Sequence, residues 1–341
     1  MLSPPTIPAP LTNQYPILKR KLQRHWWRWR SLARRSRIRS HLDRRRAQGA
    51  RFQAYPQVLL ALQAFNKDFL LQRSLQPFLD GGLRHMVVFA DGCCDRTATT
   101  AHRLLSGPGH LVIAANDRHE VANNRLALTI AQEQGCSFLL VLQDDDLYPP
   151  GLAWLDYGLA LFERDPQLLV IGLNVGLDFL AFQQADESYL TTPLRSRPEV
   201  HPEAVGIDGA FLAIRHGLPP HPAQLQHRYC QAVYRAPLLI RVDPFAAQGG
   251  FDPRFAPFQD DDTHFCLRAW SRGYRCALVQ GLPVRRDMGI GGMRLMGHIG
   301  VRRAPHTLRN IRLVHEEFGV AINDGSLQAL VDAANRTAGL R

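Results

Sequence analysis

The residues from 138 to 146 read FLLVLQDDD, and this stretch is the strongest indication of the fold in the sequence. Five apolar residues in a row are typical of a short strand that is buried on both faces, as in a parallel sheet. Three aspartates follow directly, and the segment LYPPG at residues 147–151 then turns the chain toward a helix. This order predicts a β-α unit with carboxylates at the end of its strand.

Similar units lie on both sides of this stretch. Short apolar runs predict strands at residues 58–65, 86–90, 111–115, 138–142 and 168–173, and the segments between them predict helices at 68–79, 96–105, 119–134 and 151–164. The alternation favours an α/β fold with a Rossmann-like, mostly parallel sheet flanked by helices. In such sheets ligands bind beyond the carboxyl ends of the strands, where the sequence places Asn66, Asp91, Asn116 and Asp144.

The β-α pattern is lost between residues 175 and 235. This region is rich in Pro and His, and it contains one run, at residues 205–214, that predicts a strand. We expect it to form the variable side of the molecule, where an acceptor binds.

Asp144, Asp145 and Asp146 repel one another, so a cation is their natural partner. Mg²⁺ and Mn²⁺ prefer oxygen ligands and use one or two carboxylates, while substrate phosphates and water complete the shell. The alternative is that these acids cap the next helix or face water. Their place at the end of a buried strand favours the metal.

A second acidic group closes the stretch GGFDPRFAPFQDDD, at residues 249–262. A carboxylate here could act as a general base and remove a proton from an attacking hydroxyl group. Capping of the following helix by Asp260 or Asp261 is the alternative.

Several motifs in order resemble a known family. They are LQAFN at 62–66, VFADGCCDRT at 88–97, NDRHE at 116–120 followed by Asn124, QDDD at 143–146, GGFD at 249–252, and the pair Asp261-Asp262 followed by Arg268. Over residues 58–318 the chain is similar to the inverting family-2 glycosyltransferases of the GT-A fold, in particular to a branch with N-D-x-H-E and QDDD motifs.

For the donor side, the resemblance implies that Asp91 recognises the nucleotide base and that Phe65 packs against it. Asn66 and Asn124 join this donor-binding set, and Asp144 or Asp145 would meet the ribose or the sugar.

For the reacting groups, the resemblance implies that Asp146 is the main ligand of Mn²⁺ or Mg²⁺. Asp262 becomes the general base, with Asp261 as the second catalytic candidate. Arg286 lies where many relatives carry a His, and it could hold phosphate instead. His298 is a further candidate metal ligand.

Three positions depart from the family pattern. Ala90 replaces the first Asp of the DDGS-like motif, Cys93 replaces its Ser, and Asp261 stands where Glu is common.

The activity that the resemblance implies is transfer of a hexose from a UDP- or GDP-sugar to a hydroxyl of a glycan or glycolipid, with inversion at the anomeric carbon. One alternative is an inactive GT-A-like binding module. Another is a sugar-phosphate nucleotidyltransferase, which would carry a glycine-rich loop after the first strand. Here no glycine follows that strand until Gly81.

The net charge of +11 invites a nucleic-acid partner, but the charge is concentrated at one end. Residues 1–50 hold 13 Lys and Arg against the single acid Asp43, which gives +12, and the remaining residues sum to −1. The body is electrically neutral, which argues against a nucleic-acid-binding body.

The basic end has two parts. Residues 1–16 contain five prolines and are expected to be a disordered arm. Residues 17–48 interleave Trp, Leu and Ile with Arg and Lys, which favours an amphipathic helix on an anionic membrane surface. A helix docked on the body, an RNA-binding arm and a solvated charge run remain open alternatives.

The predicted organisation is an arm and basic helix at 1–50, a catalytic domain at 51–320 and a C-terminal tail at 321–341. The six cysteines form no CxxC pair, which favours a reducing compartment. No window reaches ~18 uninterrupted apolar residues. We therefore expect a cytoplasmic protein, peripheral on the inner face of the membrane.

Overall fold

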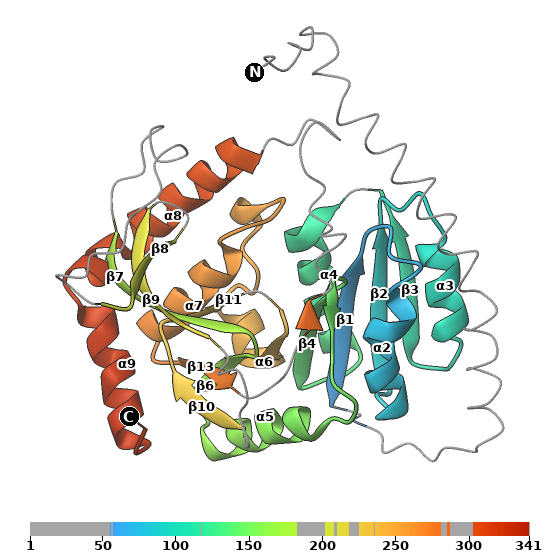
Figure 1. Ribbon diagram of the computed structural model, residues 1–341, viewed down its shortest axis with the longest axis horizontal. Coiled ribbons are helices and arrows are strands. Elements are labelled where there is room, and N and C mark those ends of the chain that lie inside the picture. Colours follow the sequence, from blue (N-terminus) through green and yellow to red (C-terminus); the bar gives the residue numbers. More distant parts are fainter. Residues whose placement is uncertain are drawn as a thin grey trace, which may run out of the picture.

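The computed structural model describes residues 55, 57–116, 118–182, 202–207, 210–217, 225–234, 236–280, 285–286 and 303–340. Within these ranges an eight-stranded and a four-stranded sheet are covered by helices, and two short strands form a third sheet (Figure 1). The predicted arm and basic helix at 1–50, together with His298, lie outside the described residues. None of the helices in the described ranges is long and apolar enough to cross a bilayer.

The large sheet has eight strands in the order β10-β13-β6-β12-β4-β1-β2-β3. Their bounds are β1 Val58–Ala64, β2 His85–Asp91, β3 His110–Ala115, β4 Phe138–Gln143, β6 Leu168–Gly172, β10 Gln226–Tyr229, β12 Leu238–Arg241 and β13 Arg275–Gln280. β1 lies parallel to both β2 and β4, and β3 continues the parallel run. β10 and β12 run antiparallel to their neighbours, so the sheet is mixed but mostly parallel, as predicted.

Helices follow the strands in the predicted alternation. They are α2 Leu71–Asp80, α3 Thr97–Leu104, α4 His119–Glu133, α5 Ala153–Arg164, α6 Val242–Ala247 and α7 Asp261–Ser271, with a 3₁₀ turn, η2, at Pro253–Phe255. α2 and α3 lie beside β1, β2 and β3 at one end of the molecule (Figure 1). β1 and β4 are almost wholly buried because helices and sheet cover both faces, which explains their unbroken apolar sequence.

The region from 175 to 235 differs from the prediction. It contains β7 Val175–Phe182, β8 Ala204–Ile207, β9 Phe211–His216 and β11 Ala232–Tyr234, which form a second sheet in the order β11-β7-β9-β8. The single predicted strand at 205–214 is therefore wrong, because β8 and β9 are two antiparallel strands of a hairpin. β8 and β11 have only four and three residues, which is too few to show a periodicity, and β7 and β9 lie outside the alternation of strands and helices on which the prediction rests.

The chain closes with two helices, α8 Arg303–Asn323 and α9 Ser326–Thr337. α8 buries one face through Ile311, Val314, Phe318 and Ile322, whose spacing of three and four residues places them on one side of a helix. α8 contacts β7, and α9 contacts β10 (Figure 1). The segment predicted as a tail is thus part of the folded domain, and the boundary at 320 falls inside α8.

Candidate active site at the carboxyl edge of the sheet

Three sequence motifs meet because β1 lies between β2 and β4. Gln63 is in register with both Phe89 and Gln143, so the chain leaves all three strands at the same edge. Phe65 and Asn66 follow β1, Asp91 ends β2, and the acidic run follows β4. The structure thus gathers these predicted residues along one edge.

Asp144 is the first acid after β4, and it is held from the loop that follows β1. Its Oδ2 accepts a 2.7 Å hydrogen bond from the backbone N–H of Phe65, and its Oδ1 lies 3.5 Å from Nζ of Lys67. Burial raises the pKa of Asp144, and the Lys67 ammonium opposes that rise. Sequence reasoning missed Lys67; the signal in the sequence was a basic residue directly after Asn66, in the loop that follows the first predicted strand.

The other two acids of the run differ in exposure. Asp145 is half-buried, whereas Asp146 is fully buried and begins β5 Asp146–Leu147. β5 pairs with β14 Arg285–Arg286, in a register that sets the backbone of Arg286 opposite Asp146. Ser74 in α2 donates a 3.0 Å hydrogen bond to the backbone carbonyl of Asp146. The backbone of Arg286, the predicted phosphate-binding residue, therefore lies beside that of Asp146, the predicted metal ligand.

Asp91, for which the resemblance implies a contact with the nucleotide base, ends β2 and is bonded to α4 in this structure. Its side chain is fully buried, and its oxygens accept hydrogen bonds from the backbone N–H groups of Arg118 and His119, at 2.8 and 2.7 Å. Asn123 donates a third, at 2.9 Å. In this structure Asp91 holds the first turn of α4 against the end of β2.

The loops after β1 and β2 are tied together by the DGCCDRT motif. The backbone N–H of Lys67 donates to Oγ1 of Thr97 at 2.7 Å, and Asp95 accepts from both the backbone and the hydroxyl of Thr97. Cys94 donates its backbone N–H to Oδ1 of Asn66 at 2.7 Å. Nδ2 of Asn66 is buried and has no hydrogen-bond partner among the described residues, so its donor capacity remains for a ligand.

The second acidic group opens α7 and lies near α4. Asp261 is buried, and its pKa is raised well above the usual range by burial, by Asp262 and by Glu120. Asp262 is half-buried and accepts a 2.8 Å hydrogen bond from the backbone N–H of Thr263. Sequence reasoning missed the part of Glu120 in this cluster, although it lies in the NDRHE motif.

Gln63 of β1 holds the start of α4 against the sheet. Its side-chain amide donates to the backbone carbonyl of Glu120 at 3.2 Å and to Oδ1 of Asn124 at 2.9 Å. Asn124 is buried and so fixes α4 against β1. The backbone N–H of Val121 donates to the carbonyl of Pro257 at 3.1 Å, which joins α4 to the loop before α7.

Backbone strain is concentrated at this edge. Among the described residues, the non-glycine residues with positive φ are Asn66, His119, Gln259 and Asp260, at 56°, 64°, 82° and 60°. Each lies in a loop or at a helix start that borders the two acidic groups. Such conformations cost about 1–3 kcal/mol each and persist where the surrounding structure enforces them, often at functional sites.

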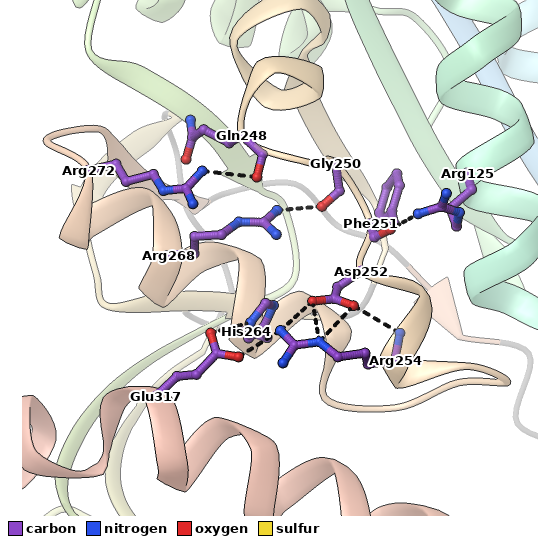
Figure 2. Close-up of polar contacts among 10 residues, drawn as sticks. All are labelled: Arg125, Gln248, Gly250, Phe251, Asp252, Arg254, His264, Arg268, Arg272 and Glu317. Carbon is purple, nitrogen blue, oxygen red and sulfur yellow. Dashed lines mark hydrogen bonds and ion pairs between the residues drawn. The ribbon is translucent and has the colours of Figure 1, made fainter.

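The GGFD loop is held by arginines from two helices (Figure 2). Arg268 donates to the carbonyl of Gly250, and Arg125 donates to the carbonyl of Phe251 at 2.8 Å. Gly250 has a φ of 59°, and a Cβ there would lie 2.6 Å from a methyl carbon of Leu128. The second glycine is therefore required both by its conformation and by the close approach of α4.

The acidic residues at this edge determine how a metal could bind here. Within the described residues no group of three His, Cys, Asp or Glu side chains could hold a metal ion alone. Asp145 and Asp146 are neighbours in the sequence and offer two carboxylates. Mg²⁺ or Mn²⁺ typically uses one or two carboxylates when substrate phosphates supply further ligands. This donor set fits an ion that binds together with a diphosphate.

No protein-family model matches the sequence, and no curated protein matches it. Among solved structures, the chain is similar to the crystal structure of GalNAc-T7 with UDP, GalNAc and Mn²⁺, with a TM-score of 0.51 and 14% sequence identity. The match covers 76% of this chain and 47% of that one, so the chain spans about half the length of that neighbour. At this identity the likeness concerns the fold. The chain has a GT-A-like fold, with a mostly parallel Rossmann-like sheet flanked by helices.

Proposed function

We propose that the protein is an inverting glycosyltransferase, which moves a sugar from a UDP- or GDP-sugar to a hydroxyl of a glycan or glycolipid. The observation that carries this proposal is that both acidic groups border the carboxyl edge of a GT-A-like sheet. Asp144–Asp146 follow β4, and Asp261 lies close enough to Glu120, at the start of α4, for the two acids to interact. One group, Asp144–Asp146, suits a metal and a diphosphate, and the other, Asp261-Asp262, suits a general base. The neighbour GalNAc-T7 was solved with UDP, GalNAc and Mn²⁺, which supports this substrate class.

The donor side is assigned to groups at the ends of β1 and β4. Nδ2 of Asn66 is free to donate to the nucleotide, and the ring of Phe65 would pack against the base. Lys67 orders this loop through Asp144 and brings positive charge to it. Asp91 is assigned to the nucleotide base, and its bonds to the start of α4 hold it in place beside this loop.

Asp146, with Asp145 beside it, would hold Mn²⁺ or Mg²⁺. When bound, the ion supplies positive charge that stabilises the departing diphosphate. Arg286 would add a further positive charge, since its backbone pairs with Asp146. These residues orient the donor so that its anomeric carbon faces the acceptor.

Asp262 is assigned as the general base. It is more exposed than Asp261, which is buried and therefore less accessible to an acceptor hydroxyl. The acceptor hydroxyl passes its proton to Asp262 as its oxygen forms a bond to the anomeric carbon. The bond from that carbon to the phosphate oxygen breaks, and its electron pair leaves with the nucleoside diphosphate.

The test compares Asp262→Asn with the wild type in two measurements. We expect the variant to lose transfer by about 10²- to 10⁴-fold, the usual contribution of a positioned base, while nucleotide binding measured by calorimetry is unchanged. Asp243→Asn, at an exposed aspartate of α6, is the matched control and should retain activity. Normal transfer by Asp262→Asn would refute the assignment.

A further inference from the structure

The loop from Asp252 to Asp260 carries the chain from the GGFD motif to the start of α7. Apart from the short turn η2 it has no regular structure, so its backbone carbonyls need partners from elsewhere. Several of these partners come from one helix, α8.

Asn310 of α8 is the centre of this contact. Its side chain is fully buried, and its Nδ2 donates to the carbonyls of Phe255, Phe258 and Gln259 at 3.3, 3.0 and 2.7 Å. The neighbouring Arg309 donates to the carbonyl of Ala256 and also to Oδ1 of Asn310. The side-chain amide of Asn310 thus donates to three carbonyls of the loop, and the guanidinium of Arg309 orients its oxygen.

One hydrogen bond of Asn310 reaches a residue whose backbone is strained. Gln259 and Asp260 are two consecutive residues with positive φ, and they stand directly before Asp261 and Asp262. Thr307, one turn earlier in α8, donates its hydroxyl to the side chain of Gln259 at 3.3 Å. The direction in which α7 starts, and with it the placement of Asp262, therefore depends on a conformation that α8 enforces.

Glu317 extends the same contact. It lies seven residues, or about two turns, after Asn310, and so on the same face of α8. One oxygen of Glu317 lies 2.6 Å from Arg254, which in turn binds Asp252, and the other lies 3.0 Å from Nε2 of His264 in α7 (Figure 2). α8 thus fixes the beginning of the loop and the helix that follows it.

We propose that Asn310 is a positioning residue of the transfer reaction, which holds the loop at 255–260 so that Asp262 meets the acceptor hydroxyl. This inference rests on the proposed role of Asp262 as the general base. Asn310 touches no substrate, and it acts through the backbone of Gln259 and Asp260. The competing role is packing alone, in which Asn310 contributes to stability and leaves the reaction of the folded protein unchanged.

Asn310→Asp separates these roles, because it keeps the shape of the side chain and replaces the donor by an acceptor facing three carbonyls. The matched control is Asn335→Asp in α9, where Asn335 binds both the N–H and the carbonyl of Tyr229 in the large sheet. All measurements are made below the unfolding transition of each variant, so that an equal fraction of each is folded.

The first measurement is amide hydrogen exchange of the backbone at residues 257–264, which needs no substrate. We expect faster exchange in Asn310→Asp than in the wild type or in Asn335→Asp. Unchanged exchange would overturn the inference.

The second measurement is turnover of the UDP- or GDP-hexose that the protein binds in calorimetry, with water or a sugar alcohol as acceptor. We expect kcat of Asn310→Asp to fall by about 10- to 100-fold, because small displacements of a reacting group are this costly, with KM for the donor within about twofold. The pH dependence of kcat should also change, since it reports the surroundings of the base. A kcat and pH profile equal to those of Asn335→Asp would overturn the inference.

Asp262→Asn in the same assay distinguishes the two proposals. If Asp262→Asn transfers normally, the assignment of the base fails, and the inference about Asn310 fails with it. If Asp262→Asn is inactive while Asn310→Asp keeps the kcat and pH profile of its control, only the positioning role fails.

Discussion

Nζ of Lys67 lies 3.5 Å from Oδ1 of Asp144, and the lysine side chain is fully buried. The two charged groups come from loops 77 residues apart, which follow neighbouring parallel strands. A buried charge is tolerated when it is paired, and removal of one partner leaves the other uncompensated. This pair therefore joins the loop that carries Phe65 and Asn66 to the acidic run.

Lys67→Met should lower the free energy of unfolding by about 3–5 kcal/mol, the usual effect of breaking a buried pair. The loss should be largest at high pH, because Asp144 can take up a proton as the pH falls and so relieve its unpaired charge. Urea unfolding of the wild type and of Lys67→Met at pH 5 and pH 8 measures this loss of free energy of unfolding. The double variant Lys67→Met, Asp144→Asn should recover much of the loss at pH 8; no recovery would show that the two groups are not coupled.

Asp146→Ala should weaken nucleotide binding only when a metal is present. The described residues contain no group that holds a metal alone, so the ion and the diphosphate are expected to bind together. Calorimetry with UDP and GDP, in Mn²⁺ and in EDTA, gives the comparison. We expect at least about a 10-fold loss of affinity in Mn²⁺ and no change in EDTA, with Asp243→Ala as the control. Unchanged affinity in Mn²⁺ would place the metal ligand elsewhere.

Asp261→Asn should stabilise the protein near neutral pH. The pKa of Asp261 is raised in the folded state by burial and by Asp262 and Glu120, so above the ordinary Asp value of about 3.9 the folded protein binds more protons than the unfolded chain. Stability is then lost as the pH rises above that value. Thermal unfolding should show a gain of at least about 2–4 °C in Tm at pH 7, and little difference at pH 3.5. A lower Tm at pH 7 would contradict this account.

Deletion of residues 1–50 tests the proposed membrane surface. The segment carries a charge of +12 and a Trp-rich stretch at 17–48, so its loss should release the protein from anionic vesicles. Sedimentation with vesicles of phosphatidylglycerol and phosphatidylcholine measures binding, and nucleotide affinity serves as the control for folding. Equal sedimentation of the full chain and the deletion would contradict the proposal.

The β-α part of the fold could be predicted because its strands are continuous apolar runs, and all of them except the edge strand β3 are buried on both faces. The predicted bounds of β1 to β4 and of β6 lie within one residue of those observed. The second sheet could not be predicted, since β8 and β11 have only four and three residues. The sheet is formed by pairing between strands that are far apart in the sequence, such as β11 with β7 and β7 with β9. The same holds for α8 and α9, whose place depends on contacts with β7 and β10.

The candidate site was partly open to prediction. Spacing and strand order placed Asn66, Asp91 and Asp144 at one edge, because parallel strands end together. The spacing of the motifs could not predict which groups each side chain contacts. Asp91 is engaged by three donors at the start of α4, and the structural part of Asn310 depends on a contact with a loop about 50 residues away.

The most direct test of the central claim is release of nucleoside diphosphate from a panel of UDP- and GDP-hexoses, measured with Mn²⁺ and with EDTA. We predict that at least one donor is turned over in Mn²⁺, that EDTA abolishes the release, and that Asp262→Asn lacks it while still binding the donor. The contradicting result is that no donor is turned over and that no nucleotide binds in Mn²⁺.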